Sequence, residues 1–306
     1  EVGGVPVASV IIPVYEHAER LRLTLASLAA QRCDWAQVEV IVVDDGSTED
    51  IAAVARAARL PVRYHCRPHA GRAATRNAGV ELARADLLLF VDADLWLPPD
   101  FVAAHLEVHR RGEADLAIGR LRHIAAENFP AVRDLLEAGA PASALEPLTR
   151  EEDYLRLLEA VYLHERRRRL MPWISCLFSN TSVRRDLIEA VGGFDESFSG
   201  WGLEDIELGW RLFRAGARFT YLPHVTSFHL DHAADGDAMV QDMVRNLKRF
   251  LQRHPYPEIR LYRRFLAGFV SLEQLERAYA GEPLDDAPPG PGETLFKPLA
   301  YSQLKS

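Results

Sequence analysis

Short apolar runs alternate with segments of helical periodicity over the first 120 residues. The runs at 7–14, 38–43 and 87–91 are rich in apolar and β-branched side chains and predict strands. Between the first two, Leu21, Leu25 and Leu28 recur at the spacing of one helix face. Further strands are expected at 62–65 and 115–121, and further helices at 50–59, 72–84 and after residue 99. Ser47 and Asp50 resemble a capping box at the start of the helix that ends near residue 59. The alternation predicts an α/β fold with a mostly parallel sheet flanked by helices.

The pattern changes after residue 124. Segment 124–170 is helical and charged, which predicts an inserted helical pair rather than more sheet. Later elements are expected as strands at 178–183 and 219–222 and as helices at 204–215, 239–251 and 272–279. We therefore expect one domain over 1–230, composed of segments 1–121, 124–170 and 171–230. Residues 231–306 would be a C-terminal helical extension that ends in a flexible tail rich in Pro and Gly.

Composition excludes several classes of protein. The 306 residues are 48% hydrophobic, which is enough for a large buried core. A formal net charge of -8 is opposite to the basic excess of nucleic-acid-binding proteins, so no nucleic-acid partner is expected. Three widely spaced cysteines indicate neither a disulfide framework nor a zinc ribbon. Because no apolar run approaches the roughly 18 residues of a spanning helix, we expect a cytoplasmic protein.

Polar residues gather where the predicted strands end. In an open α/β sheet these carboxyl ends form the ligand crevice. The second strand leads into Asp44 and Asp45, and the fourth leads into Asp92-Ala93-Asp94. No GxGxxG or GxxxxGK(S/T) motif is present, which argues against a dinucleotide site and a P-loop. Asp92 and Asp94 instead offer the hard oxygen ligands that Mg²⁺ and Mn²⁺ prefer.

A second pair of carboxylates opens the helix expected at 204–215. Leu203, Ile206 and Trp210 form one apolar stripe, which leaves Glu204 and Asp205 in the first turn on other faces. The helix dipole stabilises anions at this position, as a general base requires. An isolated pair of this kind could also serve only to complement the dipole, and the spacing alone does not separate the two roles.

Four stretches resemble the nucleotide-binding half of family 2 glycosyltransferases: ASVIIPVYE, VEVIVVDDGS, GRAATRNAG and DLLLFVDAD, in this order. Further on, GGFDESFSGWGLEDIELGWRLFRAG is similar to the acceptor-side segment of the same family. Segments 1–121 and 171–230 would then be the nucleotide-binding and acceptor-side halves of a catalytic domain. The resemblance implies a GT-A fold and a metal-dependent enzyme. Such an enzyme moves a sugar from a nucleoside-diphosphate sugar, with UDP favoured, to an acceptor hydroxyl with inversion.

The resemblance also implies roles for individual residues. Asp94 and His229 would bind Mn²⁺ or Mg²⁺, and Asp205 would be the general base, with Glu204 as its rival. Asp45 would pair with a uracil ring. The other residues expected to contact the donor or the acceptor are Pro13, Val14, Tyr15, Glu16, Arg72, Arg76, Asp92, Ala93, Trp173, Asn180, Trp201 and Gly202.

Other interpretations remain open at several of these positions. Tyr15 is also consistent with a packing aromatic, and Asp44 and Asp45 with a turn and a helix cap. The run Arg166–Arg169 is either a solvated face or an anchor for an anionic acceptor or a membrane surface. The alternatives to His229 as a metal ligand are His224, Asp231 and His232.

Two other functions are consistent with part of the pattern. A non-catalytic sugar-nucleotide-binding protein would share the residues at the strand ends. A sugar-nucleotide-forming nucleotidyltransferase would have a similar sheet, but it needs a basic, glycine-rich loop that residues 13–20 lack. The sequence names neither the donor sugar nor the acceptor, which could be a glycan, a lipid-linked sugar, a peptide or a small molecule.

Overall fold

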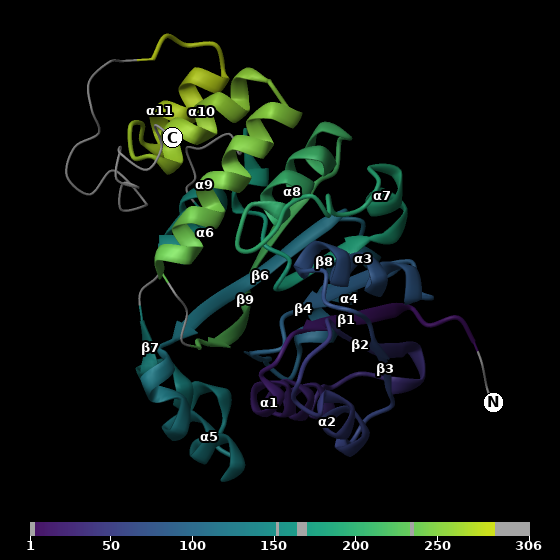
Figure 1. Ribbon diagram of the computed structural model, residues 1–306. Helices are drawn as coiled ribbons and strands as arrows, with labels where there is room; N and C mark the ends of the chain where they lie inside the picture. Colours follow the sequence, from purple (N-terminus) through teal and green to yellow (C-terminus); the bar gives the residue numbers. More distant parts are fainter. Residues whose placement is uncertain (1–3, 151–152, 164–169, 233–235, 285–306) are drawn as a thin grey trace.

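The computed structural model describes residues 4–150, 153–163, 170–232 and 236–284. These residues form one nine-stranded sheet with helices on both faces (Figure 1). The short strand β7 (Thr149–Arg150) pairs with β6 at the side of the sheet. The main path of the sheet follows the order β3 (Val62–Cys66), β2 (Val38–Asp44), β1 (Ala8–Val14), β4 (Leu87–Val91), β8 (Asn180–Arg184), β6 (Leu116–Ile124), β9 (Phe219–Leu230) and β5 (Leu95–Trp96).

The strand directions bring several carboxyl ends to one edge of the sheet. β1 to β4 run parallel, β8 runs antiparallel to both β4 and β6, and β9 runs parallel to β6. Since two reversals restore the direction, β6 and β9 point the same way as β1 and β4. The expected mostly parallel sheet is confirmed, with β8 as the exception among its longer strands. The carboxyl ends of β1, β2, β4, β6 and β9 therefore share the edge where a ligand crevice is expected.

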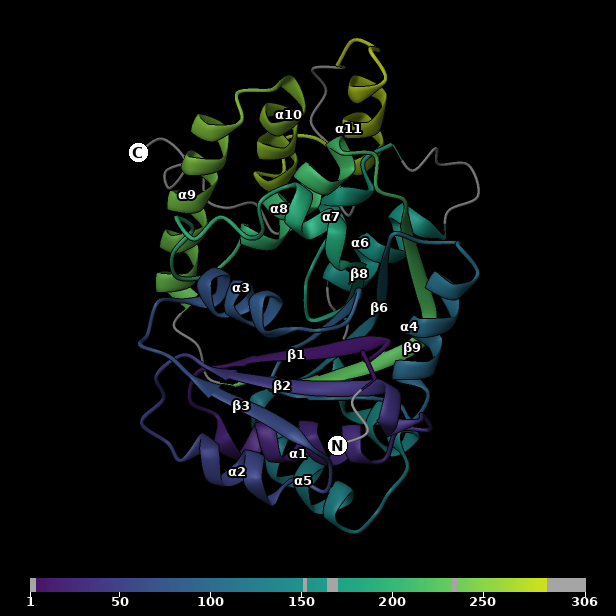
Figure 2. The same cartoon turned by 90° about the vertical axis from the view of Figure 1, so that its right-hand side faces the viewer.

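The burial of each strand follows its place in the sheet. β1, β2 and β4 are buried along nearly their whole length because helices cover both faces, whereas the edge strand β3 is largely exposed. Val10 and Ile12 of β1 belong to the cluster on the side of α1 (Ala18–Ala29), α2 (Ile51–Ala57) and α4 (Phe101–Arg110). Ile11 belongs to the cluster on the opposite side, with α3 (Arg72–Leu82) (Figure 2).

The hydrophobic cluster that contains α3 extends to the C-terminal helices. It includes buried residues of α7 (Arg185–Ala190), α8 (Glu204–Arg214), α9 (Gly236–Arg253), α10 (Pro257–Leu266) and α11 (Leu272–Tyr279). Trp210 of α8 meets Phe250 of α9 edge-on, with ring centroids 6.2 Å apart. The helices after residue 230 therefore share one hydrophobic cluster with the segment before it. The sequence did not predict α7, α10, β5 or β7.

In its described residues, the expected helical insertion contains two α-helices, two 3-10 turns and a short strand. α5 (Phe129–Glu137) packs Val132 and Leu136 in a small cluster with Leu23 of α1. α6 (Asp153–Tyr162) packs in the main cluster through Leu157 and Leu158. The 3-10 turns η2 (Ala126–Asn128) and η3 (Ala142–Leu148) and the strand β7 complete the segment. The insertion is thus tied to the sheet by a strand, which its helical pattern did not predict.

Two local predictions are wrong. α2 begins with Asp50 as its N-cap, whose carboxylate accepts a hydrogen bond from Ala53 N, while the Ser47 hydroxyl donates to Asp44. Ser47 and Asp50 therefore do not form the capping box that their spacing suggests. The strand expected at 219–222 continues to Leu230, because an irregularity in the β6–β9 register at Gly119 and Arg120 lets the pairing resume. Within the described ranges, no helix combines the length and apolarity needed to cross a membrane.

Candidate active site

A buried arginine joins three carboxylates at the shared edge of the sheet. The guanidinium nitrogens of Arg76, on α3, lie 3.1 Å from Asp92 Oδ1, 3.3 Å from Glu204 Oε1 and 3.2 Å from Asp205 Oδ1. Arg76 is only 3% exposed, so solvent screens these ion pairs little. Asp92 follows β4, whereas Glu204 and Asp205 open α8. The fold thus brings together residues that belong to three separate sequence motifs.

Asp205 has the surroundings that a base near neutral pH requires. Burial raises the pKa of its carboxyl to about 7; Arg76 opposes this effect and Glu204 adds to it. Its Oδ2 accepts a hydrogen bond from Phe178 N at 3.0 Å. Its Oδ1 makes the ion pair with Arg76 but accepts no hydrogen bond from the described residues. An acid with this pKa can take a proton from a hydroxyl and release it again.

The chain enters α8 through two residues with left-handed backbone, Gly202 (φ 92°) and Leu203 (φ 75°). Leucine rarely adopts this conformation, and strain of this kind is common at functional sites. The turn directs the start of α8 into the protein, where Glu204 and Asp205 are 5% and 7% exposed. The helix is buried continuously from Glu204 to Trp210, rather than along one stripe as the sequence suggested.

A second cluster adjoins the first where β4, β5 and β9 meet. Ligand atoms of Asp92, Asp94 and His229 all lie within 4.8 Å of one another. The pairing of Leu95 with His229 brings the DxD segment against the end of β9. Asp94 Oδ1 is buried without a hydrogen-bond partner among the described residues. Because an unpaired buried carboxylate oxygen is costly, this set of oxygen and nitrogen donors fits Mn²⁺ or Mg²⁺.

The positions of the histidines favour His229 as the third ligand. His229 Nε2 lies 3.3 Å from Asp94 Oδ2, whereas His232 Nε2 lies 3.9 Å from the same oxygen. The His232 ring also stacks on His17, with centroids 4.2 Å apart. Burial lowers the pKa of His229, but Asp94 and Asp231 outweigh it and raise the pKa to about 9. His224 has an exposed side chain.

An aromatic pair lies at the ends of β1 and β3, at the edge where a ligand crevice is expected. Tyr15 is 49% exposed, and its ring centroid lies 4.4 Å from that of His69. The Asp45 carboxylate accepts hydrogen bonds from Ala70 N and Gly71 N and lies 2.9 Å from His69 Nδ1. Asp45 is 3% exposed, so it holds the segment before α3 and orients the exposed histidine. The sequence did not single out His69.

Several predicted donor contacts have structural partners instead. The Glu16 carboxylate accepts hydrogen bonds from Thr48 N and Glu49 N, and the Thr48 amide lowers its pKa. Val14 is 4% exposed and belongs to the cluster on the side of α1. The side chains of Glu16 and Val14 therefore stabilise this edge of the sheet rather than line a site for the donor. Asp44 caps the turn, as one interpretation of the sequence expected, by accepting a hydrogen bond from Ser47 N.

Trp173 and Asn180 lie inside the core, contrary to the prediction that they contact sugar or acceptor. Trp173 has no exposed surface and packs edge-on against Tyr262. Asn180 is 2% exposed, and its amide donates to Arg120 O and to Ser227 Oγ. Asn180 thus joins β8 to β6 and β9 and is not accessible to a ligand.

Two residues of α9 hold the loop that carries Trp201 and Gly202. Asp242 Oδ2 accepts a hydrogen bond from Trp201 N at 2.9 Å, and Asn246 Nδ2 donates to Gly202 O at 2.8 Å. Asn246 is fully buried. Neither residue was a candidate, because each reads as an ordinary polar position of an amphipathic helix.

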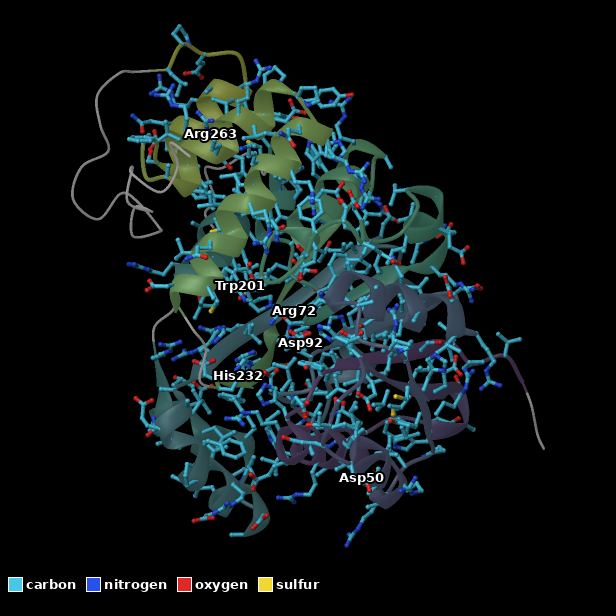
Figure 3. All side chains as sticks on the ribbon, viewed as in Figure 1. Asp50, Arg72, Asp92, Trp201, His232 and Arg263 are labelled. Carbon is cyan, nitrogen blue, oxygen red and sulfur yellow. The ribbon has the colours of Figure 1, made fainter. Side chains whose placement is uncertain are left out.

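The remaining candidates lie around the two clusters. Arg72, in the first turn of α3, lies beside Asp92 in the middle of the molecule (Figure 3). Pro13 is partly buried, and Ala93 O accepts a hydrogen bond from the Thr24 hydroxyl. Arg20 of α1, which the sequence did not indicate, donates to Leu230 O and Asp231 O. Arg166–Arg169 lie outside the described residues.

Comparison with known proteins agrees with this arrangement. The sequence model described as Glycosyl transferase family 2 matches residues 9–192, and one described as N-terminal domain of galactosyltransferase matches residues 171–233. The chain is 34% identical over 284 residues to a protein named validoxylamine A glucosyltransferase, from Streptomyces hygroscopicus subsp. jinggangensis (strain 5008). This match covers 89% of the chain and 67% of the relative.

Two solved structures share the fold at low identity. One is S. aureus TarS 1–349 in complex with UDP-GlcNAc, with a TM-score of 0.56 and 18% identity, covering 80% of this chain and 65% of that one. The other is the mannosyltransferase PcManGT from Pyrobaculum calidifontis in complex with GDP-Man and Mn²⁺, with a TM-score of 0.58 and 17% identity, covering 83% and 66%. The chain thus spans about two thirds of these proteins and of the relative. It has the GT-A fold and belongs to the family 2 glycosyltransferases.

Proposed function

We propose that this protein transfers a sugar from a nucleoside-diphosphate sugar, with a UDP-sugar favoured, to an acceptor hydroxyl with inversion at the anomeric carbon. The observation that carries the proposal is the junction at Arg76. The Arg76 guanidinium pairs with both Asp205 and Asp92. Asp205 is a buried acid with a pKa of about 7, and Asp92 is a member of the candidate metal cluster. In a direct displacement the acceptor oxygen and the leaving diphosphate oxygen are both attached to the same anomeric carbon. The base and the group that binds the diphosphate must therefore be neighbours.

The donor would lie along the carboxyl ends of β1 to β4. The exposed ring of Tyr15 and the ring of His69 offer a stacking surface for a base, and Asp45 keeps His69 in place. Arg72 lies beside Asp92, which belongs to the cluster with Asp94 and His229. The structural neighbours in complex with UDP-GlcNAc and GDP-Man support a nucleotide sugar as donor.

Asp92, Asp94 and His229 would hold Mn²⁺ or Mg²⁺. A divalent cation there compensates the negative charge that grows on the departing diphosphate. The buried Asp94 Oδ1, without a hydrogen-bond partner among the described residues, supports this assignment, as does the neighbour in complex with GDP-Man and Mn²⁺.

Asp205 would act as the general base. The acceptor oxygen bonds to the anomeric carbon as the bond from that carbon to the diphosphate oxygen breaks, and the acceptor proton passes to Asp205. One base and no covalent nucleophile are needed, so the configuration inverts. Arg76 holds Asp205 and Asp92 in fixed positions, and Phe178 N orients the carboxylate.

A panel of UDP-, GDP- and other nucleoside-diphosphate sugars, assayed for hydrolysis with Mn²⁺ and with EDTA, tests the proposal. Slow hydrolysis that needs the metal, and that Asp205→Asn reduces, is the expected result. Donor binding with neither transfer nor hydrolysis would favour the alternative of a non-catalytic sugar-nucleotide-binding protein. Because one relative is named validoxylamine A glucosyltransferase, validoxylamine A is the first acceptor to try.

A further inference from the structure

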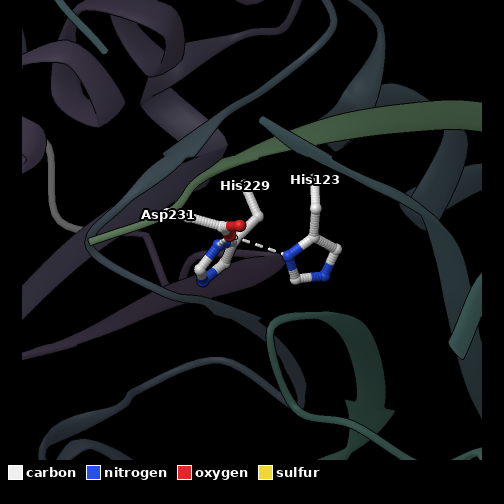
Figure 4. A group of neighbouring side chains, drawn as sticks. All are labelled: His123, His229 and Asp231. Atoms are coloured by element: carbon white, nitrogen blue, oxygen red, sulfur yellow. Dashed lines mark hydrogen bonds and ion pairs between the residues drawn. The ribbon is translucent and has the colours of Figure 1, made fainter. Parts of the chain in front are cut away.

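Asp231 stands at the centre of a polar cluster behind the candidate metal ligands. Its Oδ1 accepts hydrogen bonds from His229 Nδ1 at 2.7 Å and from His123 Nδ1 at 2.8 Å (Figure 4). Its Oδ2 accepts one from the Arg150 guanidinium at 2.7 Å. The main chain is fixed as well, since Asp231 N donates to Ile124 O and Asp231 O accepts from Arg20. The Asp231 side chain, which is 14% exposed, thus joins β9, β6 and β7, and its backbone carbonyl adds a contact to α1.

These contacts define how the His229 ring can act. A cation would bind His229 in place of the proton on Nε2; the neutral imidazole then keeps its one proton on Nδ1, which donates to the Asp231 carboxylate and leaves the lone pair on Nε2. Nε2 is the nitrogen that faces Asp94, at 3.3 Å from Oδ2. The hydrogen bond to Asp231 therefore selects both the orientation and the tautomer of His229 that ligation beside Asp94 requires.

The same three residues could instead bind a cation of their own, since ligand atoms of His123, His229 and Asp231 lie within 4.8 Å of one another. The surrounding charges argue against this. The Arg150 guanidinium is bound to Asp231 Oδ2, and Arg20 is bound to the Asp231 carbonyl. A divalent cation at this position would face two positive groups and would take the nitrogen with which His229 binds Asp231.

We propose that Asp231 is a positioning residue for the metal site, and that His123 and Arg150 hold it in place. His123 pairs in register with His229 of β9 on one side and with Arg150 of β7 on the other, so the three residues form a row across β9, β6 and β7. The insertion thereby contributes, through β7, to cation affinity at Asp94. The inference rests on the proposed function, because it requires a cation held by Asp94 and His229.

The test measures the affinity of the protein for Mn²⁺, both alone and with UDP. The free Mn²⁺ in the titration is quantified from its electron paramagnetic resonance signal. Asp231→Asn is expected to weaken Mn²⁺ binding by about 10- to 100-fold. UDP affinity measured in EDTA should not change, which separates positioning from general damage to the fold. In a His229→Ala background, Asp231→Asn should cause no further loss, because it acts only through that imidazole.

Asp115→Asn is the matched control. The Asp115 side chain is 13% exposed and pairs with Arg218 and Arg184, so this variant removes one charge from a similar setting. It lies before β6, at the opposite end of the β6–β9 pair, and should leave Mn²⁺ affinity unchanged. If Asp231→Asn does not fold, His123→Gln and Arg150→Gln replace it. Each should weaken Mn²⁺ binding by about 2- to 10-fold, which corresponds to the loss of one hydrogen bond.

The possible failures are distinguishable. If Asp94→Ala binds Mn²⁺ as the wild type does, the proposed metal site is wrong and the inference fails with it. If Asp94→Ala loses Mn²⁺ but Asp231→Asn binds it as Asp115→Asn does, only the inference is overturned. A second Mn²⁺ per chain that His123→Gln removes would also overturn it, in favour of a separate cation site.

Discussion

Replacing Asp205 by Asn is expected to separate catalysis from binding. Asparagine keeps the size of the side chain and can still accept the hydrogen bond from Phe178 N, but it cannot take a proton at neutral pH. Arg76 retains Asp92 and Glu204 as partners. We therefore expect kcat to fall by roughly 10² to 10⁴, the usual contribution of a general base, with little change in donor or metal affinity.

The same substitution should stabilise the fold at neutral pH. The folded-state pKa of Asp205 is about 7 against an ordinary value of 3.8, so ionising the buried side chain costs at most about 4 kcal/mol. Between these two pH values the folded protein keeps a proton that the unfolded chain releases, so wild-type stability falls as pH rises. The amide of the variant does not titrate, so its stability lacks this dependence. The variant should exceed the wild type by up to about 6 °C in Tm above pH 7 and match it below about pH 4.

Three measurements test this reasoning: steady-state transfer rates, thermal melts from pH 4 to 8, and the pH profile of kcat/KM. The wild-type profile should rise to a plateau above a pKa of about 7, and the residual activity of Asp205→Asn should lack that limb. Glu204→Gln is the control, since Glu204 shares Arg76. Near-normal turnover by Asp205→Asn with an inactive Glu204→Gln would make Glu204 the base. Normal turnover by both variants would show that neither carboxylate at the start of α8 is the base.

Three further predictions follow from the same geometry. Asp94→Ala should abolish Mn²⁺-dependent donor binding in calorimetry and His229→Ala should weaken it less completely; an unaltered metal response in Asp94→Ala would refute the site. Asp45→Ala should weaken UDP binding with or without metal, because it releases His69 and two backbone amides; unchanged UDP affinity with a lower Tm would leave Asp45 a purely structural role. Asn246→Ala should reduce transfer more than Mn²⁺ or UDP binding, with the exposed Gln241→Ala of the same helix as control, and equal transfer by both would show that α9 does not influence the acceptor side.

The sheet and the candidate metal cluster were predictable because local signals determine them. A fully apolar run such as 87–91 is stable only between two layers of helices, which makes β4 a central strand of the sheet. A DxD segment directly after such a strand must lie at the ligand edge, so the meeting of Asp92 and Asp94 with residues from other strand ends was expected. The third member came from the resemblance, which pointed to His229, and the β5–β9 pairing brings it to them.

The wrong assignments of Trp173 and Asn180 have a different cause. Asn180 is a polar residue, and its position in the sequence suggested a place in the site, yet it is buried. Its amide fits in the core because Gly119 has no side chain: a Cβ at Gly119 would lie 2.1 Å from Asn180 Oδ1. His105 and Ser227 then complete its hydrogen bonds from segments 75 and 47 residues away. Such a role depends on which distant residues the fold brings together, and no periodicity along the chain records it.

The structure also shows why the helices after residue 230 matter to a site formed before it. The strained turn at Gly202 and Leu203 aims Glu204 and Asp205 at Arg76, and a strained turn persists only where its surroundings hold it. The hydrogen bonds that hold this loop come from Asp242 and Asn246 of α9, and Phe250 packs that helix against Trp210. The matched family segments end at residue 233, before any of these supports. The geometry of the candidate active site therefore depends on residues beyond the segments that identify the family of this chain.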